Sequence, residues 1–121
     1  MAKILVVEDE RNLRLLYEEE LTEEGYEVLL AEDGQKALEI AKKNMPDLVI
    51  LDIMMPGMDG IETLGKLLSQ NNKIPVILNT AYSHYRNNFM SWMADAYVVK
   101  SSDLTELKSE IKRLLAERNK S

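Results

Sequence analysis

The 121-residue sequence predicts an α/β domain made of repeated βα units around a parallel sheet. Short apolar, β-branched runs alternate five times with longer amphipathic stretches. One run, Leu48–Leu51, is continuously apolar, which is typical of a strand buried on both faces of a sheet. Acidic, hydroxyl and lysine residues follow the ends of four runs, where parallel sheets of this kind bind ligands. We expect one domain that fills residues 1–121.

The five apolar runs define the expected strands. These are Lys3–Glu8, Tyr26–Ala31, Asp47–Asp52, Pro75–Asn79 and Ala96–Val99. The second run alternates less cleanly than the others, so we expect it at an edge of the sheet.

The amphipathic stretches predict helices with recognisable ends. Gly25 fits the left-handed position that closes a helix, and Asp33 and Asp103 are expected to cap helix starts. The helical signal is weakest between Tyr82 and Met93. The expected helices run from Arg11 to Glu24, Asp33 to Asn44, the Pro56–Gly60 loop to Gln70, Tyr82 to Met93, and Leu104 to Arg118.

Composition narrows the possible functions. The net charge of −6 and the pI of about 4.8 argue against direct nucleic-acid binding, which depends on clustered Lys and Arg. The chain has no cysteine, so disulfides and thiolate metal sites are excluded. No apolar run approaches the roughly 18–20 residues of a membrane span. We expect a cytoplasmic domain with no membrane contact.

The residues that end the strands predict one site. Glu8 ends the first strand and Asp9 follows it, and Asp52 ends the third strand. Thr80 follows the fourth strand and Lys100 the fifth. Parallel strands bring these groups to one crevice. Each residue alone has an ordinary structural explanation, but their joint occurrence at four strand ends points to a ligand site.

The chemistry of these groups suits a divalent metal and a phosphoryl group. Neighbouring carboxylates repel one another unless a cation neutralises them, and oxygen-only ligands favour Mg²⁺. An aspartate can serve as a nucleophile and form an acyl phosphate. Asp52 is the expected acceptor, because it is central and a Pro-Gly loop follows it. The Lys100 ammonium and the Thr80 hydroxyl are expected to contact phosphoryl oxygens.

Taken in order, these motifs resemble the receiver domain of bacterial two-component response regulators. The resemblance covers nearly the whole chain, and its motifs are highly specific in combination. It implies a flavodoxin-like, five-stranded parallel sheet in the order 2-1-3-4-5 with five flanking helices. The residues that carry it are Ile4–Glu10, Pro46–Asp52, Met55–Gly60, Thr80-Ala81 and Tyr97–Lys100.

The resemblance also implies roles for individual residues. Asp52 would accept phosphate from a sensor histidine kinase or a histidine phosphotransfer protein. Asp9, Asp52 and the Met54 backbone carbonyl would bind Mg²⁺, with Glu8 acting directly or through a water. Thr80 and Tyr97 would report phosphorylation to a downstream output domain or protein, and Lys100 would hold a phosphoryl oxygen.

Three departures from the family pattern are visible. Glu8 stands where Asp is commoner, and Ser101 stands where proline usually follows the lysine. A cis peptide at Lys100–Ser101 would therefore cost roughly 2.5–4 kcal/mol. The spacing from Thr80 to Lys100 is also about two residues shorter than usual, in the region that the family uses for output.

Two other functions remain open from the residues alone. A Mg²⁺-dependent phosphohydrolase with an aspartyl nucleophile typically has a second acid two residues later, and here that residue is Met54. An interaction module that works without phosphorylation would have no need for the acidic residues together with Lys100. We expect a phosphoacceptor switch rather than an enzyme with an external substrate.

Overall fold

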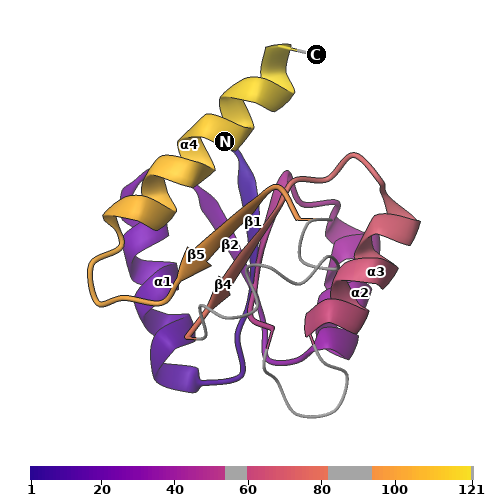
Figure 1. Cartoon of the computed structure of the whole chain (residues 1–121), viewed down its shortest axis with the longest axis horizontal. Coiled ribbons are helices and arrows are strands. Elements are labelled where there is room, and N and C mark those ends of the chain that lie inside the picture. Colours follow the sequence, from indigo (N-terminus) through magenta and orange to yellow (C-terminus); the bar gives the residue numbers. More distant parts are fainter. Residues whose placement is uncertain (54–59, 82–93, 121) are drawn as a thin grey trace.

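The computed structural model describes residues 1–53, 60–81 and 94–120, and it shows an α/β sandwich (Figure 1). The expected helix between Tyr82 and Met93 and the Met54 carbonyl lie outside the described residues. The elements are β1 (Lys3–Val7), α1 (Arg11–Glu23), β2 (Glu27–Ala31), α2 (Gly34–Asn44), β3 (Leu48–Leu51), α3 (Gly60–Gln70), β4 (Val76–Thr80), β5 (Ala96–Val99) and α4 (Thr105–Lys120).

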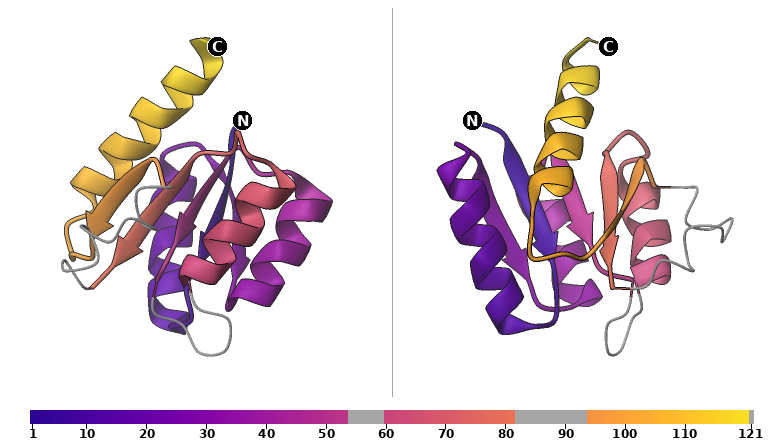
Figure 2. Two further views of the ribbon diagram at one scale, coloured as in Figure 1. Left: turned by 45° about the vertical axis from the view of Figure 1, so that its right-hand side comes forward. Right: turned by 60° about the vertical axis from the view of Figure 1, so that its left-hand side comes forward.

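The strands form one sheet in the order β2-β1-β3-β4-β5, with every neighbouring pair parallel. This confirms the predicted fold and places β2 at an edge. Helices α1 and α4 cover one face of the sheet, and α2 and α3 cover the other (Figures 1 and 2). Because all strands run the same way, their carboxyl ends lie together at one edge of the sheet.

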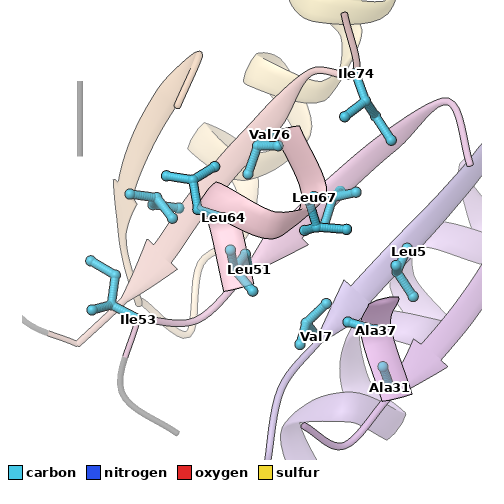
Figure 3. Close-up of a cluster of buried hydrophobic side chains, with 12 residues drawn as sticks. Leu5, Val7, Ala31, Ala37, Leu51, Ile53, Leu64, Leu67, Ile74 and Val76 are labelled. Carbon is cyan, nitrogen blue, oxygen red and sulfur yellow. The ribbon is translucent and has the colours of Figure 1, made fainter. Parts of the chain in front are cut away.

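Alternating side chains of each strand enter two separate cores. In β1, Leu5 and Val7 pack under α2 and α3, whereas Ile4 and Val6 pack under α1 and α4. Figure 3 shows the first of these cores, in which Leu64 and Leu67 of α3 meet the sheet. All of these side chains are at most 1% exposed, so the sheet is a rigid platform for whatever its carboxyl edge carries.

Several predicted helix ends are confirmed. Gly25 has φ of 95°, the left-handed conformation that a residue with a Cβ adopts rarely. The Asp33 carboxylate accepts a hydrogen bond from Lys36 N at 2.8 Å, as expected of a cap. The Asp103 carboxylate accepts from Thr105 N at 2.9 Å.

Other predicted boundaries were wrong by one or two residues. β4 begins at Val76 and includes Thr80, because Thr80 pairs with Val99 and its carbonyl accepts Lys100 N at 2.7 Å. Helix α1 ends at Glu23, where the chain turns toward Gly25. Helix α4 begins at Thr105 rather than at the buried Leu104.

Candidate phosphoryl and metal site

The two main acids of the site follow adjacent strands. Glu8 follows β1, and its N–H donates to Ala31 O at 3.0 Å. Asp52 follows β3, and its N–H donates to Val7 O at 3.1 Å. These bonds extend the sheet by one residue on each side of β1, so both side chains start from fixed backbone at the carboxyl edge.

The carboxylates of Glu8, Asp9 and Asp52 form one cluster. One oxygen from each lies within 4.8 Å of the others. Glu8 is 2% exposed and Asp52 is 5% exposed, whereas Asp9 faces solvent. The structure therefore confirms the prediction that these three carboxylates lie close together.

Lys100 brings its ammonium into the same cluster. Its Nζ lies 2.5 Å from Glu8 Oε1 and donates to Asp52 Oδ2 at 2.9 Å. The contact with Glu8 Oε1 is a buried ion pair, since the Glu8 side chain is 2% exposed. Three negative charges and one positive charge leave a formal excess of two negative charges.

The pKa values respond to this arrangement in opposite senses. Burial raises the pKa of Glu8, and the Lys100 ammonium and the Glu10 N–H only partly oppose that effect. Burial alone would lower the pKa of Lys100, but its contacts with Glu8 and Asp52 outweigh burial and raise it. Lys100 therefore keeps its positive charge, and this charge only partly neutralises the buried Glu8 carboxylate beside it.

The loop that carries Glu8 and Asp9 is held by Arg14, a residue that sequence reasoning did not single out. Its Nη1 donates to the carbonyls of Glu8 and Asp9, at 2.8 Å each. Only the start of a helix was visible in the sequence at this point. A bond from a helix side chain back to a loop carbonyl six residues away has no short-range sequence signal.

Gly60 is required by close packing against the acceptor strand. A Cβ built on Gly60 would lie 2.3 Å from Asp52 O and 2.4 Å from Ile53 Cα. Its N–H donates to Ile53 O at 2.7 Å, so α3 begins in direct backbone contact with the residue that follows Asp52. In the sequence alone, this glycine has the ordinary explanation of a loop residue.

The remaining predicted residues lie near the cluster in different settings. Thr80 ends β4 and is fully buried, and its carbonyl accepts the Lys100 N–H. Tyr97 lies one strand further, half-buried, and packs against the core under α2 and α3. The peptide bond between Lys100 and Ser101 is trans, since the described residues contain no cis peptide.

The donor set fits a hard divalent cation. It offers carboxylate oxygens and an excess of negative charge, which are the features that Mg²⁺ requires. Glu8, Asp9 and Asp52 are the described residues that could hold such an ion. Among the residues that the structure describes, the cluster contains carboxylates alone, which match a hard cation better than a soft one.

The fold and the site are those of a receiver domain. The features that indicate this are the strand order, the acidic cluster and the lysine that bridges Glu8 and Asp52. The chain belongs to the response regulator receiver domain family, whose model matches residues 4–112. It is 40% identical over 117 residues to the response regulator ArlR of Staphylococcus saprophyticus. That match covers 95% of this chain and 53% of the relative, so the chain spans about half the length of this relative.

Solved structures agree with this assignment. The chain is 52% identical to the response regulator TrrA of Thermotoga maritima, crystallised with Mg²⁺ and BeF, with a TM-score of 0.91 and coverage of 94% of this chain and 99% of that one. A second structure shows TrrA in complex with the histidine kinase ThkA, again at 52% identity, with a TM-score of 0.90 and coverage of 95% and 99%. In the part of the chain that the structure describes, none of the helices is long and apolar enough to cross a membrane.

Proposed function

We propose that this domain is a phosphorylation switch whose Asp52 accepts a phosphoryl group from a phosphohistidine. A carboxylate oxygen of Asp52 attacks phosphorus, and the bond between phosphorus and the imidazole nitrogen breaks. The electron pair of that bond returns to the imidazole nitrogen, which then takes a proton. The observation that supports this most strongly is a buried Asp52 carboxylate, hydrogen-bonded to Lys100 within an acidic cluster.

Mg²⁺ would be held by Asp9, Asp52 and the Met54 carbonyl, with Glu8 contributing directly or through a water. When bound, the ion would neutralise carboxylate and phosphoryl oxygens as charge moves onto them. The Mg²⁺ and BeF bound to TrrA and the donor set of this chain support this assignment. Arg14 would keep the loop of Glu8 and Asp9 in place.

Lys100 and Thr80 are assigned different tasks. The Lys100 ammonium already contacts Asp52 and would move its hydrogen bond to a phosphoryl oxygen. The buried Thr80 hydroxyl would then report the new charge, and the half-buried Tyr97 would change position with it. We expect the new charge to move the segment from Tyr82 to Met93, where the helical signal of the sequence is weakest; this segment lies outside the described residues.

The partners in this proposal are a phosphodonor and an output. The donor is a sensor histidine kinase or a histidine phosphotransfer protein, and the complex of TrrA with ThkA supports the former. The output is a downstream domain or protein, as the greater length of ArlR suggests. We place the reaction in the cytoplasm and expect the domain to release its own phosphate, with no external substrate.

The acceptor assignment is tested by phosphorylation with acetyl phosphate and Mg²⁺, followed by intact mass. The wild-type chain is expected to gain one phosphoryl group, and Asp52→Asn none. Asp47→Asn is the matched control, because Asp47 lies at the opposite edge of the sheet, and it should be phosphorylated normally. Label on Asp52→Asn would contradict the assignment.

The phosphohydrolase alternative predicts turnover of an added phosphate ester. Met54 in the position of the second acid argues against it. Phosphate release from such an ester by the wild-type chain, lost in Asp52→Asn, would favour the enzyme over the switch.

The lifetime of the phosphoryl group on Asp52 tests a separate point. Comparing this lifetime between wild type and Met54→Ala or Tyr82→Ala would show whether the Met54 and Tyr82 side chains keep water from the phosphoryl group.

A further inference from the structure

A buried hydrogen bond joins α1 to β4 outside the set of residues assigned above. Asn79 Nδ2 donates to the Tyr17 hydroxyl oxygen at 3.0 Å. Asn79 is 4% exposed and Tyr17 is 2% exposed, and 62 residues separate them in the sequence. Each is a polar side chain in an apolar setting, since Tyr17 belongs to the core under α1 and α4.

This pair lies next to the acidic site. Asn79 directly precedes Thr80, and Thr80 O accepts the Lys100 N–H at 2.7 Å. The charges of Lys100, Glu8 and Asp52 all act on the Tyr17 phenol, whose pKa is raised chiefly by burial. The phenol is therefore within electrostatic range of the cluster, on the α1 side of the sheet.

The geometry of a strand explains what the bond can control. Successive residues of β4 direct their side chains to opposite faces, so Asn79 faces α1 while Thr80 faces the other side. The bond to Tyr17 therefore holds β4 from the face of the sheet opposite to the Thr80 side chain. Asn79 also lines a pocket of about 180 Å³ together with Val98 of β5 and Leu107 of α4.

Helix α1 thus contacts the site at two points. Arg14 holds the carbonyls of Glu8 and Asp9, and Tyr17, one turn later, holds β4. A displacement of the end of β1 relative to the end of β4 must break or stretch a bond to Arg14 or to Tyr17, unless α1 itself deforms. These three bonds tie the acidic loop and the end of β4 to the same helix.

We propose that Tyr17 and Asn79 are positioning residues, whose hydrogen bond holds the end of β4 so that Thr80 and Lys100 meet a phosphoryl group on Asp52. The inference rests on the proposed function and adds to it a control point outside the site. In this proposal the bond favours the arrangement that receives a phosphoryl group, so a ligand that engages Thr80 and Lys100 binds more weakly when the bond is absent.

The test measures beryllofluoride, a phosphoryl analogue, binding in saturating Mg²⁺ by fluorine NMR, with the melting temperature measured on the same samples. Tyr17→Phe and Asn79→Leu are each expected to weaken binding about five-fold, the size of effect that residues coupled to a site produce. Each also leaves one buried polar group unpaired and lowers the melting temperature.

The double variant Tyr17→Phe/Asn79→Leu separates positioning from stability. Replacing both polar groups restores much of the melting temperature, because no unpaired group remains. If the bond positions Thr80 and Lys100, the double variant still binds about five-fold more weakly than wild type, because the bond is lost only once. Tyr26→Phe, in the turn between α1 and β2, is the control and should bind as wild type does.

Binding by the double variant within two-fold of wild type would overturn the inference and leave the pair a purely structural role. Should a single variant fail to fold, the double variant decides the question. Failure of the wild-type chain to bind the analogue is a different result, because it would contradict the proposed function and, with it, this inference.

Discussion

Acidic residues at the amino and carboxyl edges of the sheet differ in burial and in how they are paired. At the amino edge, Asp47 Oδ2 accepts Lys3 N at 2.7 Å, and its Oδ1 lies 3.6 Å from Arg118. Asp95 Oδ2 accepts Val76 N at 2.9 Å. Both acids are at least partly exposed, and each has partners of its own.

At the carboxyl edge, two carboxylates share one ammonium and a third carboxylate, that of Asp9, lies beside them. Glu8 and Asp52 are buried, and Lys100 is divided between them. Taking charges out of water is costly unless they are fully paired, so this edge carries an electrostatic cost that the other edge avoids. The difference indicates that the amino-edge acids stabilise strand starts, whereas the carboxyl-edge acids are held ready for a cation.

Removing Lys100 should have the largest effect. In Mg²⁺-free buffer, Lys100→Met leaves Glu8 and Asp52 buried without a cation and should lower the free energy of unfolding by about 3 kcal/mol. Added Mg²⁺ should restore much of this loss, as measured by urea unfolding with and without the ion. Lys108→Met, which breaks a more exposed pair with Glu20, should change the free energy of unfolding far less and show no response to Mg²⁺.

The next largest effect is expected at Gly60. In Gly60→Ala the new Cβ meets the backbone of Asp52 and Ile53, so α3 must move and the free energy of unfolding should fall by about 2 kcal/mol. Gly65→Ala is the matched control in the same helix, where a Cβ meets no atom within 4 Å. It should be neutral or stabilising by about 0.5 kcal/mol. Equal melting temperatures for the two variants would refute the packing argument.

Glu8→Gln tests whether excess charge binds the ion. Mg²⁺ affinity, measured by calorimetry, should fall about ten-fold, or 1.4 kcal/mol, because one ligand charge is lost. Without Mg²⁺ the variant should be more stable than wild type, since a buried charge is removed. Asp47→Asn should leave the affinity unchanged, and an equal loss there would remove the distinction between the two edges.

The smallest effect is expected from Arg14→Met. The carbonyls of Glu8 and Asp9 lose their donor, and Mg²⁺ affinity should fall about three-fold as the loop loosens. Arg113→Met, which breaks only exposed ion pairs on α4, serves as the control. Unchanged affinity in Arg14→Met would limit Arg14 to a structural role.

The same two edges show what the sequence could predict. The parallel sheet and the meeting of Glu8, Asp9 and Asp52 followed from apolar runs that end in acids, because parallel strands bring their carboxyl ends together. The strand order was implied only by the family resemblance. The acids of the amino edge gave no comparable signal. Asp47 and Asp95 are single acids at strand starts, and their partners depend on backbone groups brought close only by folding.

What the sequence could not predict depends on contacts between distant segments. The bond from Asn79 to Tyr17 joins β4 to α1, and neither residue belongs to a short motif. One signal was present: Asn79 is a polar residue in an apolar run, and a buried amide requires a partner. The identity of that partner needs the packed structure.

The most direct test of the contrast between the two edges is a Mg²⁺ titration of the unphosphorylated chain followed by residue-resolved ¹H–¹⁵N NMR. The account predicts saturable shifts for the amides of Glu8, Asp9 and Asp52, with those of Asp47 and Asp95 unchanged. Shifts of similar size at both edges, or none at the carboxyl edge, would contradict it.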